Sequence, residues 1–538
     1  MKLSIESLNN KEFWSGAGIT IPSYDVSKVS EDTKKSPVWV HFGIGNIFRM
    51  FIGGLQDTLL CKGLSDKGIV CAETFDLDIV DKIYNPFDNL VLGVTLKADG
   101  NTEKRVIGSL AEAVAVDSSN AKTWNRMKEI FCNPELSMVS FTVTEKGYAL
   151  KGSNQEYLPF VVPDIENGPD KAKGAMAVVT ALLYERFKNG AAPIAVVSMD
   201  NCSHNGEKLK NSVLTVAKEW EKRGFVTSDF TEYLNDESKV GFPWSMIDKI
   251  TPRPSAQIAD DLKALGIEDM DPVITDKKTY IAPFVNAEGP QYLVIEDKFP
   301  NGRPKLEAAG VYFTDRDTVN EVERMKVTTC LNPLHTALAV YGCVLGYESI
   351  AAEMKNPLLN KLVYGIGPGE GMEVVCDPKI LSPKDFVNEV LTERLTNAFI
   401  PDTPQRIATD TSQKVGIRYG ETIKSYVKKY GDAKKLEYIP VAIAGWMRYL
   451  LGVNDKGEEM ELSSDPMLDE LKSHFVDIKL QEKDKAKIHN ALKPILSNET
   501  IFGSDLYAVG IGDRIEEIFT AEIAGPGAVA DTLSNILM

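Results

Sequence analysis

The chain has 538 residues, of which 43% are hydrophobic and 25% charged, and these values favour a globular protein of two or more domains. Its formal net charge is -17, from 77 acidic and 60 basic residues, which argues against a general binder of nucleic acid or of membrane surfaces. A small anionic substrate is compatible with this charge if a local basic site receives it.

The seven cysteines predict reduced thiols, because no two of them form a C-x-x-C pair and their number is odd. Neither a disulfide framework nor a metal site is therefore expected. The first residues lack the apolar core of a signal peptide, and the longest apolar stretches are too short and too charged to span a membrane. We expect a cytoplasmic protein, and a monomer or a small homo-oligomer is compatible with the sequence.

Residues 1–36 show little periodicity, so we expect them to form a lead-in to the first domain. The segments that follow alternate between short apolar runs, typical of strands, and longer runs with helical spacing. They are strand–turn–helix at 37–60, strands at 67–76 and 136–150, a helix at 171–190 and strand–loop–helix at 192–220. This alternation predicts a Rossmann-like α/β domain with a doubly wound parallel sheet, which binds ligands at the carboxyl ends of its strands.

After about residue 300 the pattern changes from α/β to mostly α-helical. Proline and glycine cluster at 297–304, "DKFPNGRP", and apolar residues then recur at helical spacing. The helical segments are 335–354, 383–395, 413–431 and 438–453. We therefore predict a Rossmann-like domain over residues 1–300 and a mainly α-helical domain over residues 301–538.

A glycine turn after the first predicted strand is a sign of nucleotide binding. The stretch "HFGIGNIFR" contains Gly43 and Gly45, but Phe48 stands where a full G-x-G-x-x-G would have its third glycine. Gly43 permits a tight turn, and Gly45 lets the backbone approach a pyrophosphate at a helix N-terminus. We expect Arg49 to reach a phosphate or local carboxylates, and a plain tight turn is the alternative.

The next predicted strand ends in a carboxylate, Glu73, 30 residues after Gly43, and Asp76 is a rival for the same role. A carboxylate there would bind the adenosine ribose and repel a 2′-phosphate, which favours NAD over NADP; a solvated strand end is the alternative. The candidate cofactor-binding residues are Gly43, Gly45, Asn46, Arg49, Glu73, Asp76, Thr144 and Glu145.

Seven motifs follow one another in a fixed order along most of the chain. They are "VHFGIGNIFR", "VSFTVTEKGY", "DNCSHNG", "FPWSMIDKITP", "VIEDKFPNGRP", "RIATDTSQK" and "GWMRYLLGV". In this order they resemble the polyol-specific long-chain dehydrogenase/reductase family, which includes mannitol dehydrogenases and hexuronate reductases. The resemblance extends over residues 37–515 and implies NAD as the cofactor and no metal.

The resemblance also implies catalytic roles, position by position. Lys326 matches a general acid/base at the sugar C2 oxygen, and Glu323 matches a proton relay. Asn201 and Asn332 match two asparagines that hydrogen-bond the reacting oxygen, and His335 matches a histidine that orients the substrate. These residue types fit the chemistry, because an alcohol oxidised by hydride transfer must lose a proton and the developing alkoxide needs donors.

A substrate pocket is implied in the same way. Two basic residues in it would supply the positive charge that an anionic substrate needs in this acidic protein. The implied substrate-binding residues are Asp248, Arg406, Lys414 and Asn205.

Local sequence also supports purely structural interpretations of the same residues. The pair Asn332–Pro333 is typical of a helix N-cap followed by proline at the first helical position. Arg406, Asp410 and Lys414 lie four apart and are compatible with an ordinary row of ion pairs on one helix face. His335 is compatible with a satisfied histidine beneath the following apolar helix.

The stretch "KVTTCLNPLH" departs from the family pattern. Lys326 and Asn332 are six positions apart where the family usually has five, and Pro333 follows directly. One extra residue turns a regular helix by about 100°, and the proline would clash with the carbonyl of Thr329. We therefore predict a π-bulge or a short break between Lys326 and Pro333, which would restore the facing of both ends.

Three functions are compatible with these residues. The first is an NAD-dependent oxidoreductase that interconverts a 2-keto hexuronate and a hexonate, D-fructuronate and D-mannonate. The second keeps the enzyme class but changes the substrate to mannitol, another polyol or tagaturonate. The third is a non-catalytic dinucleotide-binding protein on the same fold, and the altered "CLNPLH" region is the reason to consider it.

Overall fold

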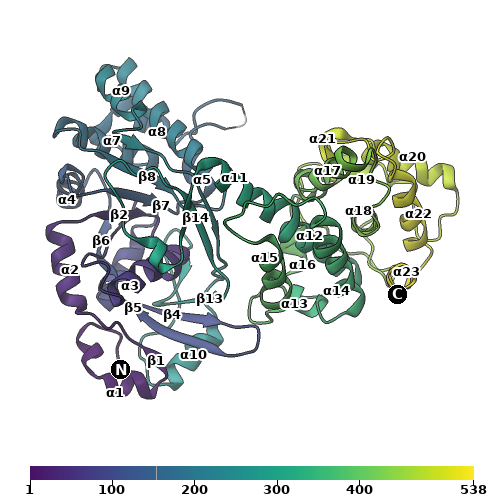
Figure 1. The fold of residues 1–538 in the computed structure, drawn as a ribbon, viewed down its shortest axis with the longest axis horizontal. Coiled ribbons are helices and arrows are strands. Elements are labelled where there is room, and N and C mark those ends of the chain that lie inside the picture. Colours follow the sequence, from purple (N-terminus) through teal and green to yellow (C-terminus); the bar gives the residue numbers. More distant parts are fainter. Residues whose placement is uncertain (153) are drawn as a thin grey trace. The chain divides into compact units, whose positions relative to one another are not determined.

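Figure 1 shows the computed structural model of the chain, which describes residues 1–152 and 154–538. The chain forms two compact units. The first contains Met1–Leu96 and Asn101–Asn320, and the second contains Lys97–Gly100 and Glu321–Met538. The main division therefore follows Asn320, whereas the sequence placed it after residue 300.

Strand pairing explains this later division. Strand β15 (Tyr312–Thr314) pairs in parallel with β14 (Tyr292–Glu296), which in turn pairs antiparallel with β10 (Ser245–Asp248). The proline- and glycine-rich stretch 297–304 lies between β14 and β15, so it is a loop inside the first unit.

A six-stranded parallel sheet is the centre of the first unit, with strand order β6-β3-β2-β7-β8-β9. Its strands are β2 (Trp39–Phe42), β3 (Ile69–Glu73), β6 (Leu110–Ala115), β7 (Met138–Phe141), β8 (Ile194–Ser198) and β9 (Val240–Gly241). The chain moves from β2 outward to β3 and β6, and then returns to β7 and continues the opposite way. The direction thus reverses between β2 and β7, which is where doubly wound sheets bind their ligands.

Both faces of this sheet are covered, as the near-continuous apolar strands predicted. Val40 and Val139 belong to one hydrophobic core and their neighbours Trp39 and Met138 to another on the opposite face. Helices of this unit include α3 (Gly53–Cys61), α4 (Ala121–Cys132), α5 (Thr144–Tyr148), α6 (Val162–Asn167), α7 (Ala175–Lys188), α8 (Asn205–Lys222), α9 (Ser228–Asn235) and α10 (Ala256–Ala264). The predicted Rossmann-like α/β fold is confirmed.

The expected lead-in is wrong, because residues 1–36 form ordered elements. They are α1 (Lys11–Gly16), β1 (Ile19–Thr20) and α2 (Val26–Lys35). Strand β1 joins a separate sheet of order β1-β5-β4-β13, which contains β5 (Thr102–Ile107), β4 (Val91–Leu96) and β13 (Phe284–Glu288). A two-stranded ribbon of β11 (Val273–Ile274) and β12 (Tyr280–Ile281) completes the pairing.

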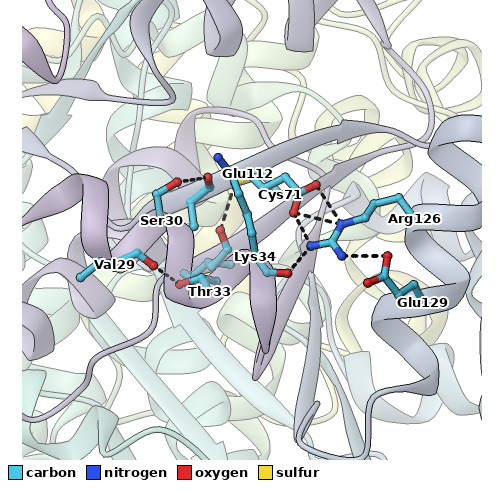
Figure 2. A network of polar contacts seen from close by, with 10 residues as sticks. Val29, Ser30, Thr33, Lys34, Cys71, Glu112, Arg126 and Glu129 are labelled. Carbon is cyan, nitrogen blue, oxygen red and sulfur yellow. Dashed lines mark hydrogen bonds and ion pairs between the residues drawn. The ribbon is translucent and has the colours of Figure 1, made fainter.

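Helix α2 is joined to the edge strand β6, and Figure 2 shows the polar contacts there. Ser30 Oγ donates a hydrogen bond of 2.8 Å to the carbonyl of Ala111. Arg126 on α4 binds Glu112 of β6 through Nε at 3.0 Å and Nη2 at 2.8 Å, and Nη2 also donates to the carbonyl of Lys34. The two helices and the sheet edge are thereby tied together, which covers an edge that would otherwise offer unpaired backbone groups.

The second unit is built mainly from helices, as the sequence predicted. Helix α11 (Arg316–Met325) leads into it from the first unit. The helices that follow are α12 (Asn332–Leu345), α13 (Ile350–Glu353), α14 (Pro357–Tyr364), α15 (Pro383–Glu389), α16 (Pro404–Ala408), α17 (Glu421–Tyr430), α18 (Tyr438–Leu450), α19 (Leu468–Ser473), α20 (Lys485–Leu496), α21 (Glu499–Phe502), α22 (Gly512–Glu522) and α23 (Ala528–Leu537). Within the described ranges, no helix combines the length and apolar character that crossing a membrane requires.

Helices α12 and α18 are the centre of the second unit, since both are buried along almost their whole length. They approach closely at Gly445, where a Cβ atom would lie 2.5 Å from the ring of Tyr341. The expected helix 335–354 divides at Gly346, which has a φ of +80° that favours glycine.

Arg186 at the end of α7 holds the first unit together without a carboxylate partner. Its buried guanidinium donates hydrogen bonds of 2.8–2.9 Å to five backbone carbonyls, those of Phe131, Asn133, Leu136, Ala192 and Pro193. These carbonyls belong to the segments that lead into β7 and β8. One side chain therefore supplies hydrogen-bond donors to the backbone carbonyls that precede both strands.

Arg186→Leu is expected to lower the free energy of unfolding by roughly 3 kcal/mol or more, because buried carbonyls would lose their donors. Urea unfolding followed by tryptophan fluorescence measures this change. The control is Arg223→Leu at the C-cap of α8, where the exposed arginine pairs with Glu219 and the expected change is within about 0.5 kcal/mol. Equal midpoints for the two variants would contradict the assigned role of Arg186.

Candidate active site

The glycine turn after β2 lies at the point where the sheet reverses direction. Gly43 has a φ of +85°, and a Cβ atom on it would lie 2.2 Å from the carbonyl oxygen of Thr142 at the end of β7. Only glycine fits there. A Cβ on Gly45 would meet no atom within 4 Å, so packing does not require glycine at that position and the backbone is open to a close approach.

Glu73 shapes the same turn from β3. Its Oε2 accepts a hydrogen bond of 3.2 Å from the backbone N–H of Ile44, between the two glycines. Its Oε1 accepts hydrogen bonds from the N–H groups of Thr74, Phe75 and Asp76. Burial raises the pKa of Glu73, and these N–H groups oppose that shift. The carboxylate is therefore fixed by the backbone, so the alternative of a solvated strand end is wrong.

Asp76 is buried as well, and it joins the turn to a different part of the first unit. Its Oδ2 accepts a hydrogen bond of 2.6 Å from Thr275 Oγ1. Its Oδ1 is buried and has no hydrogen-bond partner among the described residues. Asp76 therefore keeps one acceptor oxygen without a hydrogen-bond partner among the described residues.

Arg49 lies in a π-helical turn, η2 (Phe48–Ile52), and the structure corrects its expected role. Its guanidinium is fully buried, donates a hydrogen bond of 2.7 Å to the carbonyl of Ala282 and lies 3.4 Å from Asn46 Oδ1. Burial lowers the pKa of Arg49 to about 10. The side chain supports the turn from inside and does not reach a phosphate, whereas Asn46 is only partly buried and lies beside Gly45.

Asp200 lies two residues after the end of β8 and holds the loop after β7. Its carboxylate accepts hydrogen bonds of 2.9 Å from the backbone N–H groups of Val143 and Thr144, and one of 2.5 Å from the hydroxyl of Tyr148. Thr144 has a φ of +65°, a strained conformation that these bonds stabilise. Asp200 was not among the predicted site residues, although a carboxylate near the end of a buried strand is the same signal that selected Glu73.

Two other expected residues on these loops have structural partners. Glu145 is exposed and forms an ion pair with Lys208 on α8. Asn205 is 1% exposed, and its carboxamide donates to the carbonyls of Asp200 at 3.0 Å and Ser245 at 2.9 Å and accepts from the N–H of Ser245 at 3.0 Å. The expected substrate contact of Asn205 is therefore corrected, because its carboxamide is already used to join α8 to β10.

Asn201 and Asp248 remain as candidate substrate residues of the first unit. Asn201 is exposed on the loop between β8 and α8. Asp248 is the last residue of β10 and is buried. Asn201 therefore lies in a loop after a strand, as the sequence predicted, whereas Asp248 ends a strand.

The predicted irregularity beside Lys326 is confirmed. A π-helical turn, η7 (Lys326–Cys330), follows α11, and Leu331 then leaves helical geometry with φ −129° and ψ −61°. A π turn holds one residue more than an α turn, so it absorbs the extra residue between lysine and asparagine. Lys326 opens this turn and is 4% exposed. Glu323 lies one turn earlier on α11 and is partly buried.

Helix α12 begins at Asn332, with Pro333 as its second residue. The alternative of an N-cap is wrong, because Leu331 occupies the capping position and, in the described part of the chain, no side chain caps this end. Asn332 and His335 are three residues apart and lie on one helix face. Their side chains follow the π turn directly, so the catalytic candidates of the second unit gather at one break in the helix.

His335 lies against a carboxylate that the sequence analysis missed. Its Nε2 is 2.9 Å from Asp402 Oδ2, within ion-pair distance but not aligned for a hydrogen bond. Asp402 Oδ1 also accepts a hydrogen bond of 2.9 Å from Nε of Arg406 and contacts its Nη2. Burial alone would raise the pKa of Asp402, but His335 and Arg406 outweigh it and the pKa is lowered. In the sequence, the signal that could have identified Asp402 is its position four residues before Arg406, a spacing that favours ion pairs.

Lys414 and Arg406 do not lie on one helix. Helix α16 ends at Ala408, Asp410 has a φ of +53°, and a short 3-10 turn, η10 (Thr411–Gln413), precedes Lys414. The alternative of an i, i+4 row is therefore wrong. Lys414 Nζ donates to the carbonyl of Thr409, and burial followed by the charge of Arg418 lowers its pKa.

Glu353 is a buried acid beside this cluster. It is fully buried on α13, and neither carboxylate oxygen has a hydrogen-bond partner among the described residues. Burial, and next the negative charge of Asp402, raise the pKa of Glu353 well above its ordinary value of 4.5. The shift favours the protonated, neutral form of this side chain in the folded chain.

Because the folded state keeps a proton that the unfolded state loses above pH 4.5, Glu353 lowers stability progressively as pH rises above that value. Glu353→Gln removes the ionisation while keeping the shape of the side chain. The free energy of unfolding of this variant relative to wild type should therefore increase between pH 5 and pH 8. Urea unfolding at both pH values measures it, and a difference that does not change with pH would contradict the assignment.

The fold and the site together define a class of protein. A doubly wound sheet with a glycine turn at its reversal point is joined to a helical unit that carries a buried lysine, two features of a two-domain oxidoreductase with a Rossmann domain. The mannitol dehydrogenase Rossmann domain matches residues 38–308, and the mannitol dehydrogenase C-terminal domain matches residues 318–518. The chain belongs to the mannitol dehydrogenase family, which confirms the resemblance in the sequence.

Individual relatives cover the chain from end to end. A D-mannonate oxidoreductase of Thermotoga maritima is 53% identical over 540 residues, which is 100% of this chain and 99% of the relative. A mannitol 2-dehydrogenase of Pyricularia oryzae is 29% identical and covers 94% of this chain and 93% of its own. The mannitol 2-dehydrogenase of Pseudomonas fluorescens, solved as a ternary complex with NAD and D-mannitol, has a TM-score of 0.70 at 25% identity and covers 100% of this chain and 99% of its own.

Proposed function

We propose that this chain is an NAD-dependent oxidoreductase that interconverts D-mannonate and the ketone D-fructuronate. The observation that carries the proposal is the identity of 53% with a D-mannonate oxidoreductase over the whole chain. Mannitol 2-dehydrogenases, at 29% identity or less, support the polyol alternative only distantly.

The residues of the first unit fit a dinucleotide. Gly43 forms the tight turn against the end of β7, Gly45 leaves the backbone of the turn accessible, and Asn46 follows it after β2. Asp76 keeps a buried oxygen without a partner, and Glu73 holds the turn in place. We assign the ribose hydroxyls to these carboxylates, which would repel a 2′-phosphate and so favour NAD. Bound NAD supplies the hydride chemistry.

The chain's own residues supply the proton chemistry. Lys326 gives a proton to the ketone oxygen during reduction and removes it from the hydroxyl during oxidation. Asn332 and Asn201 donate hydrogen bonds to that oxygen as its negative charge develops. His335, held against Asp402, orients the substrate, and Glu323 relays the proton of Lys326 to solvent. Arg406 and Lys414 provide positive charge for the sugar acid.

NADH oxidation measured in parallel with D-fructuronate, D-tagaturonate and D-fructose tests the proposed substrate. We expect the highest kcat/KM with D-fructuronate, and a weaker reaction when NADPH replaces NADH. Preference for D-fructose or D-tagaturonate would favour the corresponding alternative substrate. Tight NADH binding without turnover of any ketone would favour the non-catalytic dinucleotide-binding protein.

Lys326→Ala is expected to reduce kcat by about 10²- to 10⁴-fold, the contribution typical of a general acid/base. Binding of NADH, followed by its fluorescence, should stay close to wild type because the substitution lies outside the first unit. Lys428→Ala on the exposed face of α17 is the matched control and should leave both quantities unchanged. Wild-type kcat in the Lys326 variant would remove this lysine from the mechanism.

A further inference from the structure

Arg418 is a cation of the second unit that has no carboxylate partner. It lies in a π-helical turn, η11 (Gly416–Gly420), that leads into α17. Its partly buried guanidinium donates one hydrogen bond, of 2.5 Å from Nη1 to the hydroxyl of Thr336. In the part of the chain that the structure describes, no acidic side chain pairs with it.

Other arginines of the second unit differ from Arg418 in this respect. Arg406 binds Asp402, and buried Arg448 donates to two carbonyls near Asn454 and lies close to Glu522. Arg418 has only a neutral hydroxyl, although burial lowers its pKa to about 10. A guanidinium has five donors, and withdrawing it from water without an anion is costly. Arg418 therefore keeps donors that an acceptor from outside the chain can satisfy.

The position of Arg418 connects it to the candidate active site. Its partner Thr336 is buried on α12 and follows His335 directly. Lys414 lies one turn before Arg418, and after burial the charge of Arg418 is the largest influence that lowers the pKa of Lys414. These two cations are therefore neighbours, and both lie in the same unit as Lys326.

The carboxylates around these cations have partners other than Arg418, in a chain whose net charge is -17. Arg406, Lys414 and Arg418 contribute three positive charges. Asp402 is already committed to His335 and Arg406, and Asp465 accepts hydrogen bonds from the backbone N–H and hydroxyl of Ser412. Asp410 acts on Lys414 but does not pair with Arg418.

We infer that Arg418 binds the carboxylate of the substrate and selects a sugar acid over a neutral polyol. A guanidinium presents paired N–H donors in a fixed geometry that matches a carboxylate, whereas an ammonium does not. A neutral polyol would leave the cation unpaired, so the site would disfavour it. This inference rests on the proposed function, because it names the group that reads the acid end of that substrate.

Steady-state kinetics of Arg418→Gln with D-fructuronate and with the neutral ketone D-fructose test the inference. Glutamine keeps a donor for Thr336 but removes the charge. We expect KM for D-fructuronate to rise by roughly 10- to 100-fold, the range for loss of a charge-assisted hydrogen bond, with a smaller change in kcat. The kcat/KM for D-fructose should stay the same or increase. Arg418→Lys should restore part of the affinity, because it keeps the charge but not the paired donors.

The matched control is Arg514→Gln on α22, where an exposed arginine pairs with Glu517. This variant should leave the KM and kcat for both ketones unchanged. Equal losses with both ketones, or no loss with D-fructuronate, would overturn the inference while leaving the proposed function intact. Failure of the wild-type enzyme to reduce D-fructuronate would overturn the proposed function and the inference with it. If Arg418→Gln does not fold, Arg418→Lys replaces it. A higher KM for D-fructuronate than in the wild type, with an unchanged KM for D-fructose, then supports the inference. Equal changes with both ketones, or no change with D-fructuronate, overturn it.

Discussion

The loops around the candidate nucleotide site depend on carboxylates that accept hydrogen bonds from backbone N–H groups. Asp200 binds the N–H groups of Val143 and Thr144 after β7, and Glu73 binds that of Ile44 after β2. A buried carboxylate is stable only when such donors surround it, and loop N–H groups without a partner are costly in turn. Where the sheet reverses direction, the carboxylates accept hydrogen bonds from the loop N–H groups, and these groups in turn stabilise the buried carboxylates. A residue at or near the end of a neighbouring strand therefore fixes the conformation of each loop.

In the second unit, the constraint is the length of chain between the candidate catalytic residues. One extra residue must be accommodated between Lys326 and Asn332, and the π turn η7 followed by Leu331 does so while α12 restarts at Asn332. Pro333 fits this arrangement because the first turn of a helix needs no N–H from it. A π turn is wider than an α turn, and α12 begins anew after it, so the side chains on both sides depart from regular α-helical spacing. Such irregularities are common at functional sites. The break is therefore compatible with catalysis rather than evidence against it.

Much of the fold and part of the site could be predicted from the sequence. Alternating apolar strands and helices identified the parallel sheet. The spacing of Lys326 and Asn332, which is one residue longer than the family pattern, and the proline that follows identified the break. Helix α2 was missed because its apolar positions, Val26 and Val29, are few and its packing surface is an edge strand far along the chain. The sequence also could not separate Asn205 from Asn201, since only tertiary contacts decide which carboxamide is buried against Ser245. Arg49 was misjudged for the same reason, because its acceptor is the distant carbonyl of Ala282.

Three arginines, Arg186, Arg49 and Arg418, differ in the hydrogen-bond acceptors that the fold offers them. Arg186 and Arg49 both lie in the interior, and each finds backbone carbonyls there, so their charge serves packing. Arg418 finds one hydroxyl and neighbours another cation, Lys414, which no packing requirement explains. Arg418 keeps donors with which no acidic side chain of the described residues pairs. The carboxylate of the proposed substrate would supply the acceptor that these donors lack.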